Sequence, residues 1–359
     1  MDLKKRTKTA DRLYLTGLIL LSLCLLISGC RKDDDEEKTD VVLTTAFEEN
    51  ELFRIESKNC YIEEASVYMD SAGSRYQDVF GEEIWKQNFG GKTLEHELKD
   101  TTLARLAQIK SMDLLAEEWN VALDEKEEEK AGKAAKKYYD ALTRSGIREG
   151  ITEELLLSMY SEYALADKIY REVTRNVNPE ISDDEARSIT VKQILFKTSD
   201  QDRAGNRREY SEHDKEDAYK RAKKCLEELK GGADFDSLTE KYNEDSKNTY
   251  TFGKGVMPEP FEHEAFNLDT GEVSNIVETE YGYHIIKCIS SFDEKETDDN
   301  KVRIVTERKN EAFNRVYDEF VPTLHSNLNE ELWKRFEYDP NSGKSPEFSF
   351  FEVYDEIFN

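Results

Sequence analysis

Apolar side chains recur every three or four positions along most of the segment between residues 42 and 188. This spacing places them on one face of a helix and leaves the charged residues on the other. Asp124 and Glu127 have the spacing of a capping box, so a helix is predicted from Glu125 to Leu142. Further elements are predicted as helices over 94–115 and 152–176 and as a short strand or hairpin over 47–61. These patterns predict a mostly helical N-terminal region.

The pattern changes to an alternation of period two at Val191–Phe196, which predicts a strand. Two helices are then predicted, an amphipathic one over 218–229 and a shorter one over 235–242 that Asp234 caps. Strands resume after residue 246. The order strand, helix, helix, strand, strand predicts an α+β domain over residues 189–291, about a hundred residues in all.

Helical spacing returns over residues 292–336, where Pro322 is expected to break or kink the helix because it lacks a backbone N–H. The last segment, 337–359, is acidic and rich in aromatic residues: Phe348, Phe350, Phe351, Tyr354 and Phe358. We predict that this tail is flexible, and a docking strand or a self-occupying segment is the alternative.

The N-terminal residues 1–29 have the composition of a leader. Five basic residues precede an apolar run, Leu13–Ser28, that is shorter than the roughly 20 residues of a membrane-spanning helix. The run ends Ile27-Ser28-Gly29-Cys30, which resembles a bacterial lipobox and implies cleavage before a lipidated Cys30. An uncleaved N-terminal anchor is the alternative. Residues 30–41 are predicted to be a charged tether, so the body is expected on the extracytoplasmic face of the cell membrane.

The net charge of the chain is −27. Residues 1–29 contribute five basic and two acidic groups, so their removal leaves −30. A strongly negative surface excludes nucleic acid as a partner. The five histidines and five cysteines lack the spacing of metal ligands or of a disulfide framework, and we find no phosphate-binding glycine loop, so we expect no metal and no cofactor.

An ordered series of motifs fills residues 252–287. It reads Gly253-x-Gly255-x-Met257, Pro260-Phe261-Glu262, Ala265-Phe266, Gly271-Glu272-Val273, Val277-Glu278-Thr279 and Tyr281-Gly282-Tyr283-His284-Ile285-Ile286-Lys287. The series resembles the second half of a parvulin-type peptidyl-prolyl isomerase (rotamase) domain, and the resemblance implies an α+β fold (β-α-α-β-β) with a small antiparallel sheet. The helical regions on both sides resemble, less specifically, those of extracytoplasmic foldases of the PrsA and SurA type. In that family the C-terminal helix packs on the N-terminal region, which implies that the isomerase domain is inserted in one chaperone module.

The resemblance implies a site. Phe252, Met257 and Phe261 match the pocket for the substrate proline, and Asp245, Thr279 and His284 match the polar residues around the substrate amide. Gln193 stands where parvulins usually have a first histidine, so we expect altered turnover. Each position also has a structural interpretation: Met257 and Phe261 as core, Asp245 as a turn residue and His284 as a buried hydrogen-bonding residue. Arg203, Arg207 and Arg208 form either a substrate-selecting basic loop or a solvated one.

The resemblance implies a lipid-anchored isomerase and foldase that assists exported, unfolded proteins with X-Pro bonds. The alternative is a holding chaperone that keeps the parvulin fold with little catalysis, which Gln193 and the atypical segment 247–251 favour. We expect lipidated Cys30 to anchor the protein to the membrane. The sequence does not decide between a monomer and a homodimer.

Overall fold

The computed structural model describes residues 46–89, 91–201, 207–338 and 348–359. The predicted leader and the whole of the predicted tether lie outside the described residues. The chain divides into two compact units, one made of residues up to 176 together with 310–359, and the other of residues 177–309. Helix α10 (Glu294–Phe320) begins in the second unit and ends in the first.

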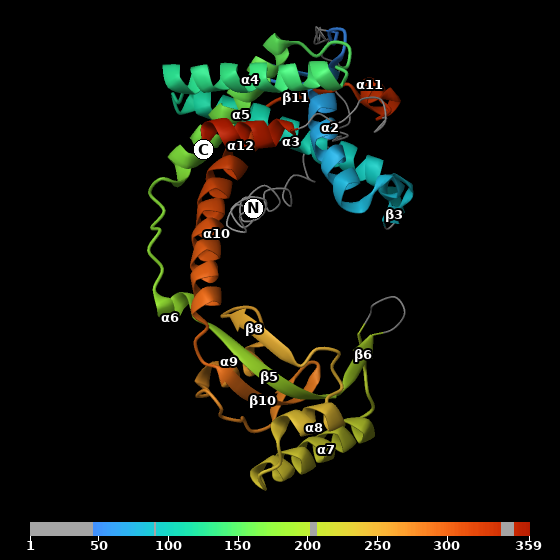
Figure 1. Ribbon diagram of the computed structural model, residues 1–359, viewed down its shortest axis with the longest axis vertical. Coiled ribbons are helices and arrows are strands. Elements are labelled where there is room, and N and C mark those ends of the chain that lie inside the picture. The colour runs from blue at the N-terminus through green and yellow to red at the C-terminus, as the bar shows by residue number, and fades with distance from the viewer. Residues whose placement is uncertain (1–45, 90, 202–206, 339–347) are drawn as a thin grey trace, which may run out of the picture. The chain divides into compact units, whose positions relative to one another are not determined.

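The first unit is mainly helical (Figure 1). Its helices are α2 (Ile62–Phe80), α3 (Leu94–Glu118), α4 (Glu125–Ser145), α5 (Glu153–Thr174), α11 (Glu330–Arg335) and α12 (Phe350–Phe358), with the 3-10 turns η3 (Glu82–Lys86) and η4 (Val321–Thr323). An antiparallel sheet has the order β11 (Ser326–Leu328), β1 (Glu51–Ile55), β2 (Lys58–Tyr61), and β3 (Asn88–Phe89) pairs with β4 (Lys92–Thr93).

Local sequence explains where these helices begin. The Asp124 carboxylate accepts the backbone N–H of Glu127, and the Glu127 carboxylate accepts that of Asp124, so the predicted capping box is present. Thr93 and Thr152 cap α3 and α5 through their hydroxyl oxygens. The apolar faces of these helices form one core with the end of α10, where Phe313 and Tyr317 are buried.

The second unit contains a four-stranded antiparallel sheet of order β8-β5-β10-β9. The strands are β5 (Ser188–Lys197), β8 (Thr249–Gly253), β9 (Val277–Thr279) and β10 (Gly282–Ser290), and β6 (Ser199–Gln201) pairs with β7 (Arg207–Glu209). The helices are α6 (Asp183–Ala186), α7 (Glu212–Lys230), α8 (Phe235–Tyr242), α9 (Glu259–Asn267) and the start of α10. The predicted α+β class and order are confirmed, with α9 and the β6–β7 hairpin as additions.

The structure corrects one prediction. The prediction that the tail over 337–359 is flexible is wrong for its described residues 348–359. Residues 350–358 form helix α12, and Phe350 is fully buried in the helical unit. The segment docks on the unit as a helix, whereas the docking alternative expected a strand. Within the described part of the chain, no helix is long and apolar enough to cross a membrane.

Candidate functional site

The two faces of the four-stranded sheet have different roles. Side chains alternate along β5 and β10, so Ile194, Phe196 and Ile285 pack under α7 and α8. Gln193 and His284 lie on the opposite face, where Val191 and Ile286 form an apolar cluster with α9. Gln193 pairs with Ile286 and His284 with Leu195, which makes Gln193 and His284 diagonal neighbours.

The four predicted polar site residues are joined in one chain of hydrogen bonds. The Gln193 amide nitrogen donates to Asp245 Oδ2 at 2.8 Å, and its oxygen lies 2.7 Å from His284 Nδ1. Thr279 Oγ1 lies 2.7 Å from His284 Nε2. Gln193 and His284 are buried, whereas Asp245 and Thr279 are partly exposed. The structure therefore brings all four residues together. Asp245 and Thr279, at the two ends of this series of hydrogen bonds, are accessible to solvent.

The direction of every bond in this chain follows from its ends. The Asp245 carboxylate accepts from the Gln193 NH₂ group, so the amide oxygen of Gln193 is turned to His284. His284 Nδ1 must then carry the proton, which leaves Nε2 as an acceptor for the Thr279 hydroxyl. The Thr279 oxygen in turn accepts the backbone N–H of Tyr281 at 3.1 Å. Gln193 thus selects one tautomer of neutral His284.

Burial keeps this histidine neutral. Desolvation lowers the pKa of His284 from 6.5 to about 4, and the negative charge of Asp245 only partly opposes this. The neutral imidazole is consequently the form present at physiological pH.

Tyr250 is a further member of the site. Its hydroxyl donates to Asp245 Oδ2 at 2.6 Å, the same oxygen that Gln193 contacts. Burial and, after it, the Asp245 carboxylate together raise the pKa of Tyr250 to about 12, so the hydroxyl keeps its proton. The sequence marked residue 250 only as atypical for a parvulin. No local pattern indicates that a tyrosine on β8 reaches a turn residue five positions earlier.

The predicted apolar residues form a separate side of the site. Phe252, Phe261 and Phe266 pack edge to face or tilted, and the Phe261 ring meets the His284 ring edge-on at 5.2 Å between centroids. Phe252 and Phe261 are about 5% exposed or less, but Met257 is half-buried against them. Met257 is therefore the predicted pocket residue with the most surface available to a ligand.

Glu262 on α9 holds the loop that carries Met257. Its carboxylate accepts the backbone N–H groups of Gly255, Val256 and Met257 at 2.8–3.3 Å. Gly255 has φ +84, a left-handed conformation that favours glycine. Glu262 belongs to the quoted motif series, but its contacts with this loop were not predicted.

The loop arginines form local ion pairs. Arg207 pairs with Glu280 at 2.7 Å, and Arg208 forms two hydrogen bonds to Asp200. Arg203 lies outside the described residues. In the ranges that the structure covers, Cys60, Cys225 and Cys288 are buried free thiols, and no group of three or more His, Cys, Asp and Glu side chains is placed to hold a metal.

Comparison with known proteins relates this chain to a family of prolyl isomerases. Residues 194–290 match the model of the rotamase family, described as the PPIC-type PPIase domain. A "Foldase protein PrsA" of Caldanaerobacter subterraneus is 29% identical over 254 residues, which cover 68% of this chain and 74% of that protein. The chain contains a parvulin-type rotamase domain and is similar to PrsA foldases. The 254 aligned residues exceed the 97 residues of the matched domain, so the similarity includes part of the helical unit.

Other relatives and solved structures match this chain over different lengths. "Foldase protein PrsA 4" of Bacillus cereus is 33% identical over 121 residues, and this chain spans 41% of its length. The crystal structure of PrsA from Bacillus subtilis has 22% identity and a TM-score of 0.25, covering 69% of this chain and 88% of that one. A PrsA structure from Bacillus cereus has 17% identity and a TM-score of 0.33.

Proposed function

We propose that this PrsA-like foldase is anchored to the extracytoplasmic face of the cell membrane through lipidated Cys30 and catalyses prolyl isomerisation in unfolded exported proteins. The chain of hydrogen bonds from Asp245 to Thr279 beside half-buried Met257 is the observation that supports catalysis. We also propose the domain limits expected from the sequence, with residues 42–188 and 292–336 as one chaperone module around the isomerase domain.

The uncatalysed reaction is slow because amide resonance sets a rotation barrier of about 18–20 kcal/mol. Twisting the X-Pro bond removes that resonance, so negative charge leaves the carbonyl oxygen and a lone pair returns to nitrogen. We propose that the proline ring contacts Met257 over the floor formed by Phe252 and Phe261. An apolar contact of this kind removes water from the reacting bond.

We propose that Asp245 faces the substrate carbonyl. A fixed negative charge there disfavours the planar amide, whose oxygen is more negative, relative to the twisted state. Gln193 and Tyr250 hold the carboxylate by binding one of its oxygens. Thr279 and His284 form the other polar end of the site. His284 acts in this proposal as a positioning residue, because it is buried and neutral.

A second function has an observation in its favour. The Tyr250 hydroxyl and the Gln193 amide both bind Asp245 Oδ2, which restrains the carboxylate and places a bulky tyrosine beside it. This arrangement favours a holding chaperone with weak turnover.

A proline-limited refolding assay separates the two functions. The chain from Arg31, which holds every described residue, is added in catalytic amounts to a substrate whose slow refolding phase is set by X-Pro bonds. We expect acceleration of that phase. An unchanged phase with full suppression of client aggregation would exclude the isomerase and leave the holding chaperone. Gln193→His, measured beside it, tests whether the glutamine limits the rate.

A further inference from the structure

Helix α12 packs on the helical unit as an amphipathic helix. It contacts α4 and α2, and Figure 1 shows it alongside α4 and α5. Its residues Phe350, Val353 and Tyr354 have positions i, i+3 and i+4 and are less than 5% exposed. Ile357 and Phe358 continue the stripe and are partly buried. The apolar contact of α12 is therefore made by one side of the helix.

The surface that receives α12 has an aromatic floor. The Phe350 ring stacks on Tyr160 with centroids 4.0 Å apart and an angle of 8°. Tyr138 and Tyr163 meet the same ring edge-on at 6.0 Å, and Tyr68 lies 5.2 Å from it. We call this surface the tyrosine face and define it by these four tyrosines together with Ser71.

The tyrosine face also binds the backbone of the helix. The Ser71 hydroxyl oxygen accepts the Phe350 backbone N–H at 3.0 Å, and the Tyr160 hydroxyl donates to the Phe350 carbonyl at 3.0 Å. Ser71 is further linked to the Tyr138 hydroxyl at 3.2 Å. All three hydroxyl-bearing residues are buried, so α12 supplies partners to polar groups that burial would otherwise penalise. Because the bonds from Ser71 and Tyr160 are made to backbone groups, the first turn of a docked helix of another sequence can make them too.

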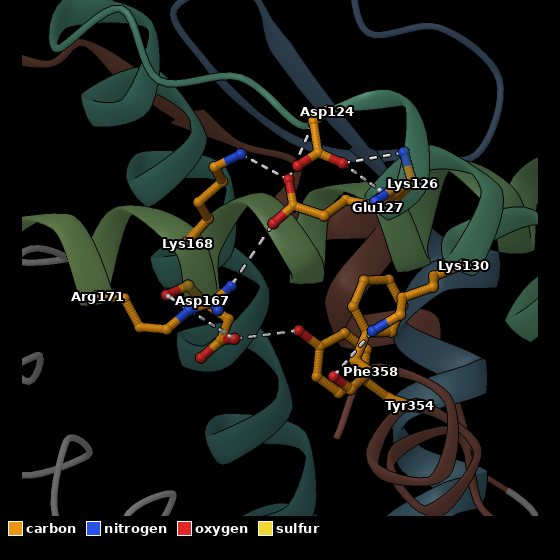
Figure 2. A network of polar contacts seen from close by, with 9 residues as sticks. All are labelled: Asp124, Lys126, Glu127, Lys130, Asp167, Lys168, Arg171, Tyr354 and Phe358. Atoms are coloured by element: carbon orange, nitrogen blue, oxygen red, sulfur yellow. Dashed lines mark hydrogen bonds and ion pairs between the residues drawn. The ribbon is translucent and has the colours of Figure 1, made fainter.

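Basic side chains surround the tyrosine face although the chain is strongly acidic. Arg105 lies over the Phe351 ring at 4.8 Å, and Lys137 pairs with Glu356 at 2.5 Å. Lys130 donates to the Phe358 carbonyl at 3.2 Å and lies over its ring, as Figure 2 shows. These contacts match a helix that carries aromatic and acidic residues together.

The same view shows what fixes the far end of the helix. The Tyr354 hydroxyl donates to Asp167 at 3.3 Å, and Asp167 also pairs with Arg171 (Figure 2). Glu127 holds Lys168 at 2.5 Å beside them. Asp167, the partner of Tyr354, belongs to α5 and would remain in place for another helix.

We propose that the tyrosine face is a binding site for acidic, aromatic amphipathic helices of client proteins and that α12 occupies it in cis. The proposal rests on the foldase function and adds a client class to it. A helix of nine residues is not stable alone in water, so α12 folds as it docks. A client segment with the same spacing makes the same contacts, and it competes against the high effective concentration of a tethered α12.

The test keeps the whole protein and cuts only the connection to α12. A protease recognition sequence is placed within residues 339–347 of the chain from Arg31, and a fluorescein-labelled peptide of residues 348–359 is added before and after cleavage. We expect at least tenfold tighter binding after cleavage, measured by fluorescence anisotropy. A peptide carrying Phe350→Ala should lose that binding, whereas a scrambled peptide sets the background.

The second step uses a client. After cleavage the protein should suppress aggregation of an unfolded client at lower concentration, and the unlabelled peptide should reverse this gain. Cleaved protein that stays folded but never exchanges α12 for the peptide would show that α12 is a permanent part of the core and overturn the proposal. Peptide binding without any effect on the client, or α12-dependent dimers in light scattering, would overturn the client class. Prolyl turnover in the same samples reports the isomerase independently.

Discussion

Acidification should destabilise the isomerase unit through His284. Its pKa is about 4 in the folded protein because burial disfavours the charged ring, against 6.5 for the free side chain. Between these values the unfolded chain binds a proton that the folded chain does not, so stability is full above about pH 6.5 and falls as the pH decreases toward 4. A difference of about 2.5 pH units at about 1.36 kcal/mol each corresponds to a loss of about 3.4 kcal/mol.

The assay must report on this unit alone. The three tryptophans, Trp85, Trp119 and Trp333, all belong to the helical unit, so their fluorescence does not report on the isomerase unit. Native-state hydrogen exchange of peptides from β5 and β10, read by mass spectrometry and corrected for the intrinsic pH dependence, measures the opening free energy directly.

A matched pair of variants isolates the histidine. His284→Gln removes the titrating group, and the opening free energy of β10 should then vary much less between pH 6.5 and 4. His263→Gln changes an exposed histidine on α9 and should keep the wild-type slope. If wild type and His284→Gln lose stability equally on acidification, His284 is not held neutral by burial and the derived direction of the hydrogen bonds fails.

Three further outcomes are expected. Met257→Ala should lower kcat/KM for prolyl turnover about tenfold with little loss of stability, because Met257 is half-buried. Phe261→Ala should lower turnover and also destabilise the domain, because Phe261 is buried. Unchanged rates in both folded variants would show that these residues do not form the proline pocket. Gln193→His should raise turnover in the refolding assay if the glutamine limits it, and an equal rate would exclude that limit. Asp113→Asn should stabilise the helical unit by roughly 2–4 kcal/mol at pH 7. Burial raises the pKa of Asp113 from 3.8 to about 8, so as the pH rises the unfolded chain loses this proton before the folded chain does, which favours unfolding. Denaturation monitored by tryptophan fluorescence should show that the gain in the free energy of unfolding becomes smaller toward about pH 4.

Elements with strong end signals were predictable from sequence. Helix α8 has the bounds that the sequence predicts, because Asp234 caps its first turn and Asn243 leaves the helical conformation. Helix α9 was missed because Pro258-Glu259-Pro260 looks like a loop, although a proline is compatible with a first helical turn. The stripe Phe350, Val353, Tyr354 and the capping pair Ser349–Glu352 were present in the predicted tail. That this stripe docks could not be predicted, because the tyrosine face that receives it is formed by residues far away in the sequence.

The membership of the site was predictable only in part. Asp245, Thr279 and His284 were found through the order of the parvulin motifs. The bond of His284 to Gln193 follows from the pairing of β10 with β5, and its bond to Thr279 from the pairing of β10 with β9. Tyr250 was not found because a tyrosine on an edge strand has no local signal for binding a carboxylate. Glu262 was quoted for its motif alone, since its backbone partners become adjacent only after the loop 255–257 folds back on α9.

The fixed direction of the network connects these observations to catalysis. A histidine at position 193 would meet Asp245 and His284 with two ring nitrogens that can exchange roles, whereas an amide keeps its donor and acceptor. The glutamine therefore ties the tautomer of His284 to the charge on Asp245. If Asp245 binds a substrate and its orientation changes, the amide must turn with it, and His284 and Thr279 must follow. A site of this kind can remain ordered and bind proline while responding slowly to the twisting amide. Comparison of kcat with KM for Gln193→His distinguishes these effects: a change in kcat alone indicates a constraint on the twisting step, and a change in KM alone indicates an effect on binding.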